Sequence, residues 1–243
     1  MYRAVEQYFD LIYPHDDFAR AFAPAMPDLI NRLGRSSDLR VLDLCCGTGR
    51  ALRPFRDLPG AMLTGADQNR TMLTRARKLF PQGRFIEKDI RQLAPAELGD
   101  RNFDVAIIAG VSLLHFSSDE RCSIFALAAN VLRPGGLLIF DVLRDNQGAK
   151  QETFIKSEFE VSDRDIIVVY HRKYESTVAF HTAMVVELPS TGCGDTRFAS
   201  DCFAFYPLTE AAAQAEATAA GFHQPGVLRT EYRASSFLCF SAA

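Results

Sequence analysis

The stretch from Val41 to Arg50, VLDLCCGTGR, brings together an aspartate, two cysteines and two glycines. Asp43 lies in an apolar run typical of a buried strand, where an unpaired carboxylate is costly and needs a partner. A cationic ammonium group on a ligand is a natural partner. Gly47 and Gly49 come between this strand and a helix, so they allow a tight turn and a close approach of the backbone to a ligand. Taken alone, the glycine pair could also be a purely structural turn.

The cysteines predict neither a metal site nor a redox pair. They are Cys45, Cys46, Cys122, Cys193, Cys202 and Cys239. None forms a C-x-x-C pair, and no histidine lies at zinc-like spacing from them. We therefore expect small, buried, reduced thiols and no bound metal.

Two further aspartates follow expected strands. Asp67 lies at the end of the second strand, in LTGADQN, where a carboxylate can accept both hydroxyls of a ribose. Asp89 follows the next strand, in FIEKDI, where it could accept the exocyclic amine of an adenine. Either aspartate could instead cap a helix, and that alternative stays open.

Short apolar runs alternate with helix-like segments from Leu39 to Val142. The expected strands are Arg40–Leu44, Met62–Ala66, Arg84–Lys88, Phe103–Ala109 and Leu137–Val142. The expected helices between them are Arg50–Asp57, Arg70–Leu79 and Glu120–Val131. Strands that are apolar on both faces and separated by helices favour a parallel sheet covered on both sides. The prediction is a doubly wound α/β fold, in which ligands bind beyond the carboxyl ends of the strands.

The flanking segments follow other patterns. Residues 2–33 predict one or two helices broken near Pro14, Pro24 and Pro27. After Val142, four strand candidates follow one another without intervening helices, which favours antiparallel hairpins; they are Phe159–Val161, Ile166–Tyr174, Ala179–Leu188 and Phe198–Tyr206. A helix at Thr209–Ala220 and strands at Val227–Tyr232 and Phe237–Phe240 end the pattern. We expect a single domain over 1–243, with an N-terminal helical segment over 1–35 and an antiparallel β insertion over about 150–207.

The series VLDLCCGTG, GADQN, EKDI, FDVAIIAGVSLLHF and VLRPGGLLIFDV resembles the motifs of class I S-adenosyl-L-methionine (SAM) dependent methyltransferases in order and spacing. A pyrophosphate-binding dehydrogenase would need G-x-G-x-x-G, and Leu52 stands at the third glycine. The segment YFDLIYP resembles the lid helix of small-molecule N-methyltransferases of the amino-sugar and glycine type. The resemblance implies a Rossmann-like, seven-stranded sheet with N-terminal lid helices and an antiparallel β insertion after the fifth strand.

The resemblance also implies which residues bind SAM. They are Tyr8, Asp43, Gly47, Gly49, Asp67, Gln68, Asp89, Ile90, Ala109 and Gly110. Asp43 and the two glycines would hold the methionyl part, Asp67 the ribose, and Asp89 the edge of the adenine. Gln68 would lie beside the adenine and Ile90 against it, while Ala109 and Gly110 would line the sulfonium region. Cys45 and Cys46 would only shape the turn.

Methyl transfer from a sulfonium is an in-line displacement, so the protein chiefly aligns the acceptor and excludes water. A base is needed only when the acceptor is protonated. The candidate catalytic groups are His115, Tyr13, Tyr170 and Tyr174. A histidine bonded to local backbone, or a tyrosine that packs a helix, is the alternative for each. Strand alternation places Tyr170 and Tyr174 on one face of the insertion and His171 on the other. His181 could also reach the acceptor, and Arg144 and Arg172 could pair with its carboxylate or phosphate.

The bulk properties limit the partners. A net charge of −3 and a pI of about 6.0 give no basic excess for a nucleic acid. No signal peptide is visible, and the longest apolar window is too short for a membrane span, which predicts a cytoplasmic protein with a small-molecule substrate. The expected activity is methyl transfer from SAM to a nitrogen or oxygen acceptor. Three alternatives stay open: cyclisation of SAM with release of methylthioadenosine, non-catalytic SAM binding, and methylation of a macromolecule. The acceptor, the number of methyl groups and the oligomeric state are not specified.

Overall fold

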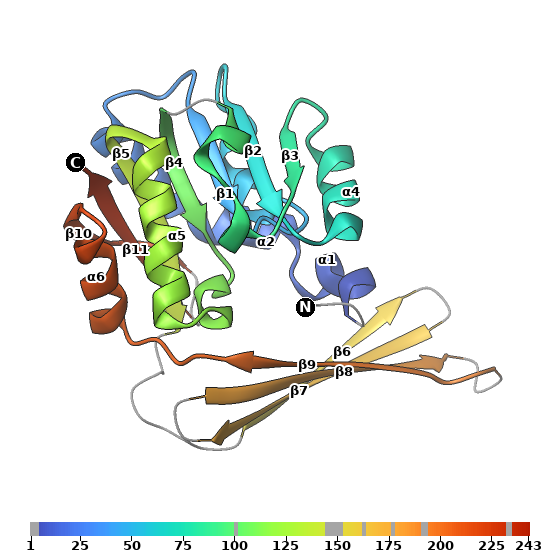
Figure 1. Ribbon diagram of the computed structural model, residues 1–243. Coiled ribbons are helices and arrows are strands. Elements are labelled where there is room, and N and C mark those ends of the chain that lie inside the picture. The colour runs from blue at the N-terminus through green and yellow to red at the C-terminus, as the bar shows by residue number, and fades with distance from the viewer. Residues whose placement is uncertain are drawn as a thin grey trace. The chain divides into compact units, whose positions relative to one another are not determined.

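The protein divides into two compact units (Figure 1). The structure is a computed structural model that describes residues 5–99, 102–143, 153–161, 164–175, 178–190, 194–231 and 235–243. We call Tyr13–Gln147 with Leu208–Ala243 the α/β unit, and Met1–Ile12 with Gly148–Pro207 the insertion unit. Within the described ranges, no helix is both long enough and apolar enough to cross a bilayer.

The α/β unit contains a seven-stranded sheet in the order β10-β11-β5-β4-β1-β2-β3. Its strands are β1 (Arg40–Leu44), β2 (Met62–Asp67), β3 (Arg84–Glu87), β4 (Phe103–Ile108), β5 (Leu132–Leu143), β10 (Phe222–Leu228) and β11 (Ser235–Ala242). The first five run parallel, and β11 is antiparallel to both of its neighbours. From β1 the chain proceeds outward to β2 and β3, and it then crosses to β4 and β5 on the other side of β1. Such folds bind ligands at the carboxyl end of the strands where this change of direction occurs, which here is the end of β1. The predicted fold class is therefore confirmed.

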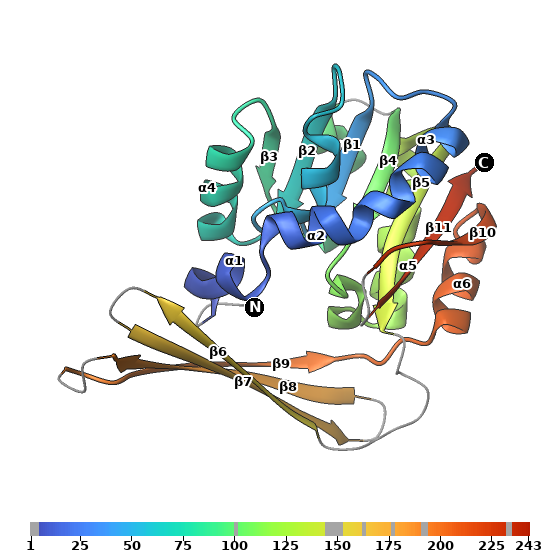
Figure 2. The ribbon, with the colours of Figure 1, turned by 180° about the vertical axis from the view of Figure 1, so that it is seen from behind.

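Helices cover both faces of this sheet. They are α2 (His15–Phe22), α3 (Met26–Leu33), α4 (Arg70–Leu79), α5 (Ser118–Val131) and α6 (Glu210–Ala219). Figure 1 shows α5 and α6 in front of the sheet, and Figure 2 shows α2 and α3 on the opposite face. The core on the α2 side joins Phe18 and Phe22 to Leu73 of α4 and Phe237 of β11. On the α5 face, Phe140 packs against the rings of both Phe125 and Phe240.

Capping residues explain where several helices begin. Asn69 accepts a hydrogen bond from the Met72 N–H at the start of α4, and Ser117 with Glu120 forms a capping box at α5. Pro14 immediately precedes α2, as predicted. A helix break was also expected at Pro27, but this proline lies in the first turn of α3, where a missing N–H costs nothing.

Three predicted elements of the α/β unit are wrong in type or in bounds, and in the insertion unit β6 (Thr153–Val161) begins at Thr153 rather than Phe159. The helix expected at Arg50–Asp57 is a 3-10 helix, η3 (Arg50–Phe55), with Pro54 inside it. Strand β5 begins at Leu132 rather than Leu137, so the Pro-Gly-Gly segment lies within the strand. Strand β10 covers Phe222–Leu228 and so begins before the predicted Val227.

The insertion unit is an antiparallel sheet in the order β6-β7-β8-β9, with the N-terminal turns η1 (Glu6–Tyr8) and α1 (Phe9–Ile12). The strands are β6 (Thr153–Val161), β7 (Arg164–Glu175), β8 (Val178–Pro189) and β9 (Arg197–Phe205). Alternate residues of β8 are buried, from Ala179 to Glu187, so one face of this sheet is buried and the other is more exposed. The antiparallel insertion after the fifth strand is confirmed.

Candidate functional site

The carboxyl ends of three adjacent strands meet at one edge of the α/β sheet. Strand β1 lies between β2 and β4, and Asp43 is in register with both Gly65 and Ile107. The loops that follow these strands therefore begin at the same level. This arrangement brings the predicted residues of the first, second and fourth motifs together.

The turn after β1 requires its glycines. Gly47 and Gly49 have φ angles of 53° and 85°, a region that favours glycine. A Cβ atom on Gly49 would lie 2.7 Å from the ring of Phe80, whereas one on Gly47 would be 3.4 Å from the sulfur of Met72. The Gly47 N–H donates to Asp67 over 2.8 Å, which ties this turn to the end of β2.

Asp43 is the most unusual group at this edge. Its side chain is buried with 1% of the residue exposed, and its Oδ2 has no hydrogen-bond partner. Burial raises the pKa of Asp43 well above the usual range, the charge of Asp67 raises it further, and Arg50 opposes both. A buried acceptor without a donor is costly, so this oxygen is suited to a cationic or hydrogen-bond-donating ligand group.

Arg50 is a functional candidate that the sequence reasoning missed. Its guanidinium carbon lies 5.1 Å from the ring centre of Tyr13 and 5.3 Å from that of Phe18. The same charge lowers the pKa of both Asp43 and Asp141. The signal was available, because Arg50 directly follows the Gly-Thr-Gly turn.

Asp141, in β5, is a second residue that the sequence reasoning missed. It is 2% exposed, and burial raises its pKa to about 6 despite its hydrogen bonds. Its Oδ1 accepts the Val111 N–H over 2.8 Å. Val111 has a φ of 52°, which is strained for a β-branched residue, and Gly110 before it has a φ of 77°. Asp141 therefore holds the loop that contains Ala109 and Gly110, and an acid near the end of the fifth strand was the available signal.

His15 connects helix α2 to the glycine turn. Its Nε2 lies 3.0 Å from the hydroxyl oxygen of Thr48, which is fully buried between the two glycines. The sequence reasoning assigned no role to either residue. Their contact fixes the start of α2 beside the turn.

Of the two other predicted acids, Asp89 caps a 3-10 turn, whereas Asp67 bonds to backbone without capping α4, which Asn69 caps. Asp67 accepts N–H groups from Gly47 and Asn69, each over 2.8 Å, and burial raises its pKa. Asp89 accepts the Arg91 N–H over 3.0 Å and pairs with its guanidinium over 2.5 Å, which lowers the pKa of Asp89. Each carboxylate oxygen has two lone pairs, so these bonds leave capacity for a ligand.

The remaining predicted residues of the α/β unit lie in loops after the strands. Gln68 follows β2 and is exposed, and Ile90 is buried at the start of a 3-10 turn. Ala109 and Gly110 directly follow β4 and are half-buried. His115 is half-buried and ends the 3-10 turn Ser112–His115 beyond them.

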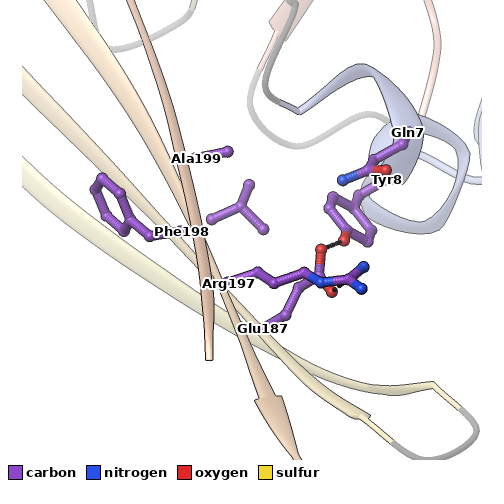
Figure 3. A pocket seen from close by; sticks show the side chains of 7 residues that line it. Gln7, Tyr8, Glu187, Arg197, Phe198 and Ala199 are labelled. Atoms are coloured by element: carbon purple, nitrogen blue, oxygen red, sulfur yellow. Dashed lines mark hydrogen bonds and ion pairs between the residues drawn. The ribbon is translucent and has the colours of Figure 1, made fainter. Parts of the chain in front are cut away.

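Tyr8 belongs to the insertion unit and lines a pocket of about 210 Å³ there (Figure 3). Its hydroxyl donates to Glu187, and burial together with this bond raises the pKa of Tyr8 to about 12. Arg164 and Arg197 lie 3.7 and 3.9 Å from the same carboxylate. Tyr8 was predicted to bind SAM, and in the structure its hydroxyl holds the N-terminal segment to β8.

The two other predicted tyrosines also lie in the insertion unit. Tyr170 is 9% exposed on the buried face of the sheet, and its ring centre is 5.3 Å from that of His181. Tyr174 pairs with Ala179 in register, but its side chain lies outside the described residues, as does all of Arg144.

The cysteines correct one expectation. Cys45 and Cys46 have pKa values raised well above the usual range by burial, which makes them unreactive thiols. Cys122 and Cys202 are exposed rather than buried as expected. In the described part of the chain, no group of three or more metal-ligating side chains comes together.

The residues at the sheet edge fit the cofactor that the motifs imply. The orphan oxygen of Asp43 suits the amino group of SAM. The Asp67 carboxylate, at the end of the adjacent strand, suits ribose hydroxyls. These hydrogen-bond acceptors are thus matched to a nucleoside that carries a cationic amino acid tail.

Comparisons with known proteins agree with this fit. Residues 41–136 match the methyltransferase domain family. Trans-aconitate 2-methyltransferase from Acidovorax sp. (strain JS42) is 30% identical over 112 residues, which are 46% of this chain and 41% of that protein. The SAM-bound structure of CalS10, an amino pentose methyltransferase from Micromonospora echinaspora, superposes with a TM-score of 0.81 at 18% identity, covering 98% of this chain and 97% of that one. The sugar N-methyltransferase KedS8 from Streptoalloteichus sp. gives a TM-score of 0.76 at 20% identity, covering 96% and 92%.

The matched segment spans 41% of the length of the Acidovorax trans-aconitate 2-methyltransferase. The likeness to the solved structures shows the fold. Residues 41–136 thus match a methyltransferase domain, and the chain shares the fold of the solved methyltransferases named above. The resemblance drawn from the motifs is therefore confirmed for this segment and for the fold.

Proposed function

We propose that this protein transfers the methyl group of SAM to a nitrogen or oxygen atom of a small molecule. The observation that carries the proposal is the partnerless, buried Oδ2 of Asp43 beside the glycine turn. A charge in that position is costly in the free protein and is compensated when a cationic ligand group binds.

SAM supplies a methyl group that its sulfonium has already activated, so the residues of this chain bind and orient. Asp43 accepts a hydrogen bond from the amino group, and the backbone at Gly47 and Gly49 lets the methionyl chain approach closely. Asp67 accepts from the ribose, while Asp89 and Ile90 hold the adenine. Such positioning accounts for most of the catalysis in this type of reaction.

His115 is the proposed general base for an acceptor that enters protonated. It lies on the loop after β4, beyond the proposed sulfonium-lining residues Ala109 and Gly110. Its imidazole can take the proton that the nucleophile must lose near neutral pH. Tyr13 lies over the Arg50 guanidinium, so its ring orients that charge near Asp43 rather than acting as a base.

Small-molecule acceptors are supported by the names of the similar proteins, which include a trans-aconitate and two sugar methyltransferases. The net charge of −3 supports the same choice over a nucleic acid. We infer that the protein works in the cytoplasm, where SAM is made and thiols stay reduced.

Two measurements test the proposal. The purified protein is titrated calorimetrically with SAM and, as a control, with NAD, and it should bind only SAM. It is then incubated with SAM alone, and the products are separated by mass spectrometry. SAM should remain intact. Methylthioadenosine formed without an acceptor would show cyclisation of the cofactor, and failure to bind SAM would refute the proposal.

A further inference from the structure

One row of side chains crosses the buried face of the insertion sheet. Arg172 of β7 lies directly opposite His181 of β8, which in turn lies opposite Phe203 of β9. Directly opposite residues in antiparallel strands share a face, so these three form neighbours across the sheet. Together with Tyr170 and Phe205 we call them the Arg172 cluster.

His181 is enclosed by aromatic rings. Its ring centre lies 5.3 Å from Tyr170, 5.2 Å from Phe203 and 4.9 Å from Phe205. The residue is 9% exposed, and its Nδ1 is buried without a hydrogen-bond partner. Burial lowers the pKa of His181 to about 4, so the imidazole is neutral at physiological pH and keeps an N–H to donate.

Arg172 brings a permanent charge to the same place. Its guanidinium carbon lies 5.4 Å from the ring centre of Phe205, and its Nε is buried without a partner. The described residues give Arg172 no carboxylate within ion-pair distance. Asp201 is one row away on this face, and its carboxylate accepts the Val5 N–H over 3.3 Å.

We propose that the Arg172 cluster is a binding site for a small anionic ligand that carries a carboxylate or a phosphate. Arg172 supplies the charge and His181 an N–H, while Tyr170, Phe203 and Phe205 form the apolar walls. This inference goes beyond the proposed function, because it assigns a class of ligand to the insertion unit by itself.

The chemistry favours an anion over other ligands. A guanidinium presents a planar set of donors that matches carboxylate and phosphate oxygens. After burial, the positive charge of Arg172 is the next cause that lowers the pKa of His181, so the guanidinium makes the potential around the ring positive. A cationic ligand would be repelled, and a purely apolar one would leave the buried Nε and Nδ1 atoms unsatisfied.

The alternative is that Arg172 and His181 only pack the sheet. The two roles differ in whether ligand binding depends on the charge of Arg172. A packing role tolerates replacement by side chains of similar shape, and any loss would affect all ligands equally. Recognition of an anion depends on the guanidinium and is selective for charged probes.

Calorimetry on the full-length protein separates the two roles. Citrate and pyrophosphate serve as the carboxylate and phosphate probes, at constant ionic strength, with and without S-adenosylhomocysteine. At least one anion should bind, and Arg172→Gln should weaken it by at least about tenfold. The affinity of Arg172→Lys for the anion should lie between those of the wild type and Arg172→Gln. His181→Phe should weaken anion binding while preserving the aromatic packing. The preferred probe identifies the source of the anionic group.

Lys173→Gln is the matched control, since it removes the same charge from the exposed neighbouring position of β7. It should change the affinity by less than about twofold. The inference is overturned if neither anion binds, or if Arg172→Gln and Lys173→Gln behave alike with intact circular dichroism spectra. Binding of S-adenosylhomocysteine is measured separately in each protein, so a failed cofactor site is recognised as a failure of the proposed function instead.

Discussion

At the scale of single residues, the site depends on two buried carboxylates that share one arginine. Asp43 and Asp141 both have raised pKa values because burial disfavours their charged forms, and Arg50 opposes that effect at each. The two carboxylates differ in their hydrogen-bond partners. Asp141 is hydrogen-bonded to Val111, whereas one oxygen of Asp43 has no partner. Asp141 therefore supports the loop, and Asp43 is available to a ligand.

Replacement of Asp43 by asparagine tests this division. Asp43→Asn keeps the shape but removes the charge, so SAM should bind at least about tenfold more weakly. The free protein should be at least as stable as the wild type, because a buried charge without a partner is removed. Calorimetric titration and thermal denaturation measure the two effects. Unchanged SAM affinity would mean that Asp43 has only a structural role.

Asp141 predicts a specific dependence of stability on pH. Its pKa rises from 3.8 to about 6 in the folded protein, so the folded state binds the proton more tightly than the unfolded state. The stability due to this proton is fully present below the lower value and is lost as the pH rises through the upper one. Relative to Asp141→Asn, the wild type should lose about 3 kcal/mol of unfolding free energy over this interval.

Asp141→Asn is a suitable reference because its amide oxygen can still accept the Val111 N–H. Urea denaturation of both proteins at several pH values gives the difference directly. A difference that stays constant with pH would show that Asp141 does not titrate as the buried environment requires.

At the scale of elements, the turn after β1 distinguishes its two glycines. Gly49→Ala combines a φ of 85° with a contact of 2.7 Å to Phe80, whereas Gly47→Ala meets its nearest atom at 3.4 Å. We expect Gly47→Ala to cost about 1 kcal/mol, from backbone strain alone, and Gly49→Ala about 3 kcal/mol. Thermal denaturation of both variants measures the difference. Equal losses would contradict the proposed packing of Phe80 against the turn.

Elements with a clear apolar period could be predicted from the sequence. Strand β1 and helix α4 have the expected bounds, because an apolar run between polar segments and a capping asparagine mark them. The error at β5 has a physical cause. Its Pro-Gly-Gly segment reads as a loop, yet Leu132 is in register with Phe103, and a register shift follows on β4.

The candidate site was predicted where motifs mark it and missed where tertiary contacts create it. Asp43, Asp67 and the glycines were found because they follow strands. Arg50, Asp141 and His15 were missed because their importance depends on neighbours that are distant in the chain. The contact of His15 with Thr48, for example, joins positions 33 residues apart.

At the scale of the whole molecule, the chain returns to earlier segments in both units. Tyr8 bonds to Glu187 across 179 positions, and Val5 bonds to Asp201 across 196. Alternation predicted an antiparallel insertion, but it contains no information about which distant segment joins that sheet. The resemblance to a methyltransferase lid helix assigned Tyr8 to SAM binding, whereas the Tyr8 hydroxyl makes its hydrogen bond within the insertion unit.

The central claim is that the protein moves a methyl group from SAM to a small acceptor. The most direct test is incubation with SAM that carries a deuterated methyl group, together with a fractionated metabolite extract, followed by mass spectrometry. Wild-type protein should produce S-adenosylhomocysteine and one or more small molecules that carry the deuterated methyl, whereas Asp43→Asn should produce far less of both. Labelled SAM that is bound but never consumed, or label found only in methylthioadenosine, would contradict the account.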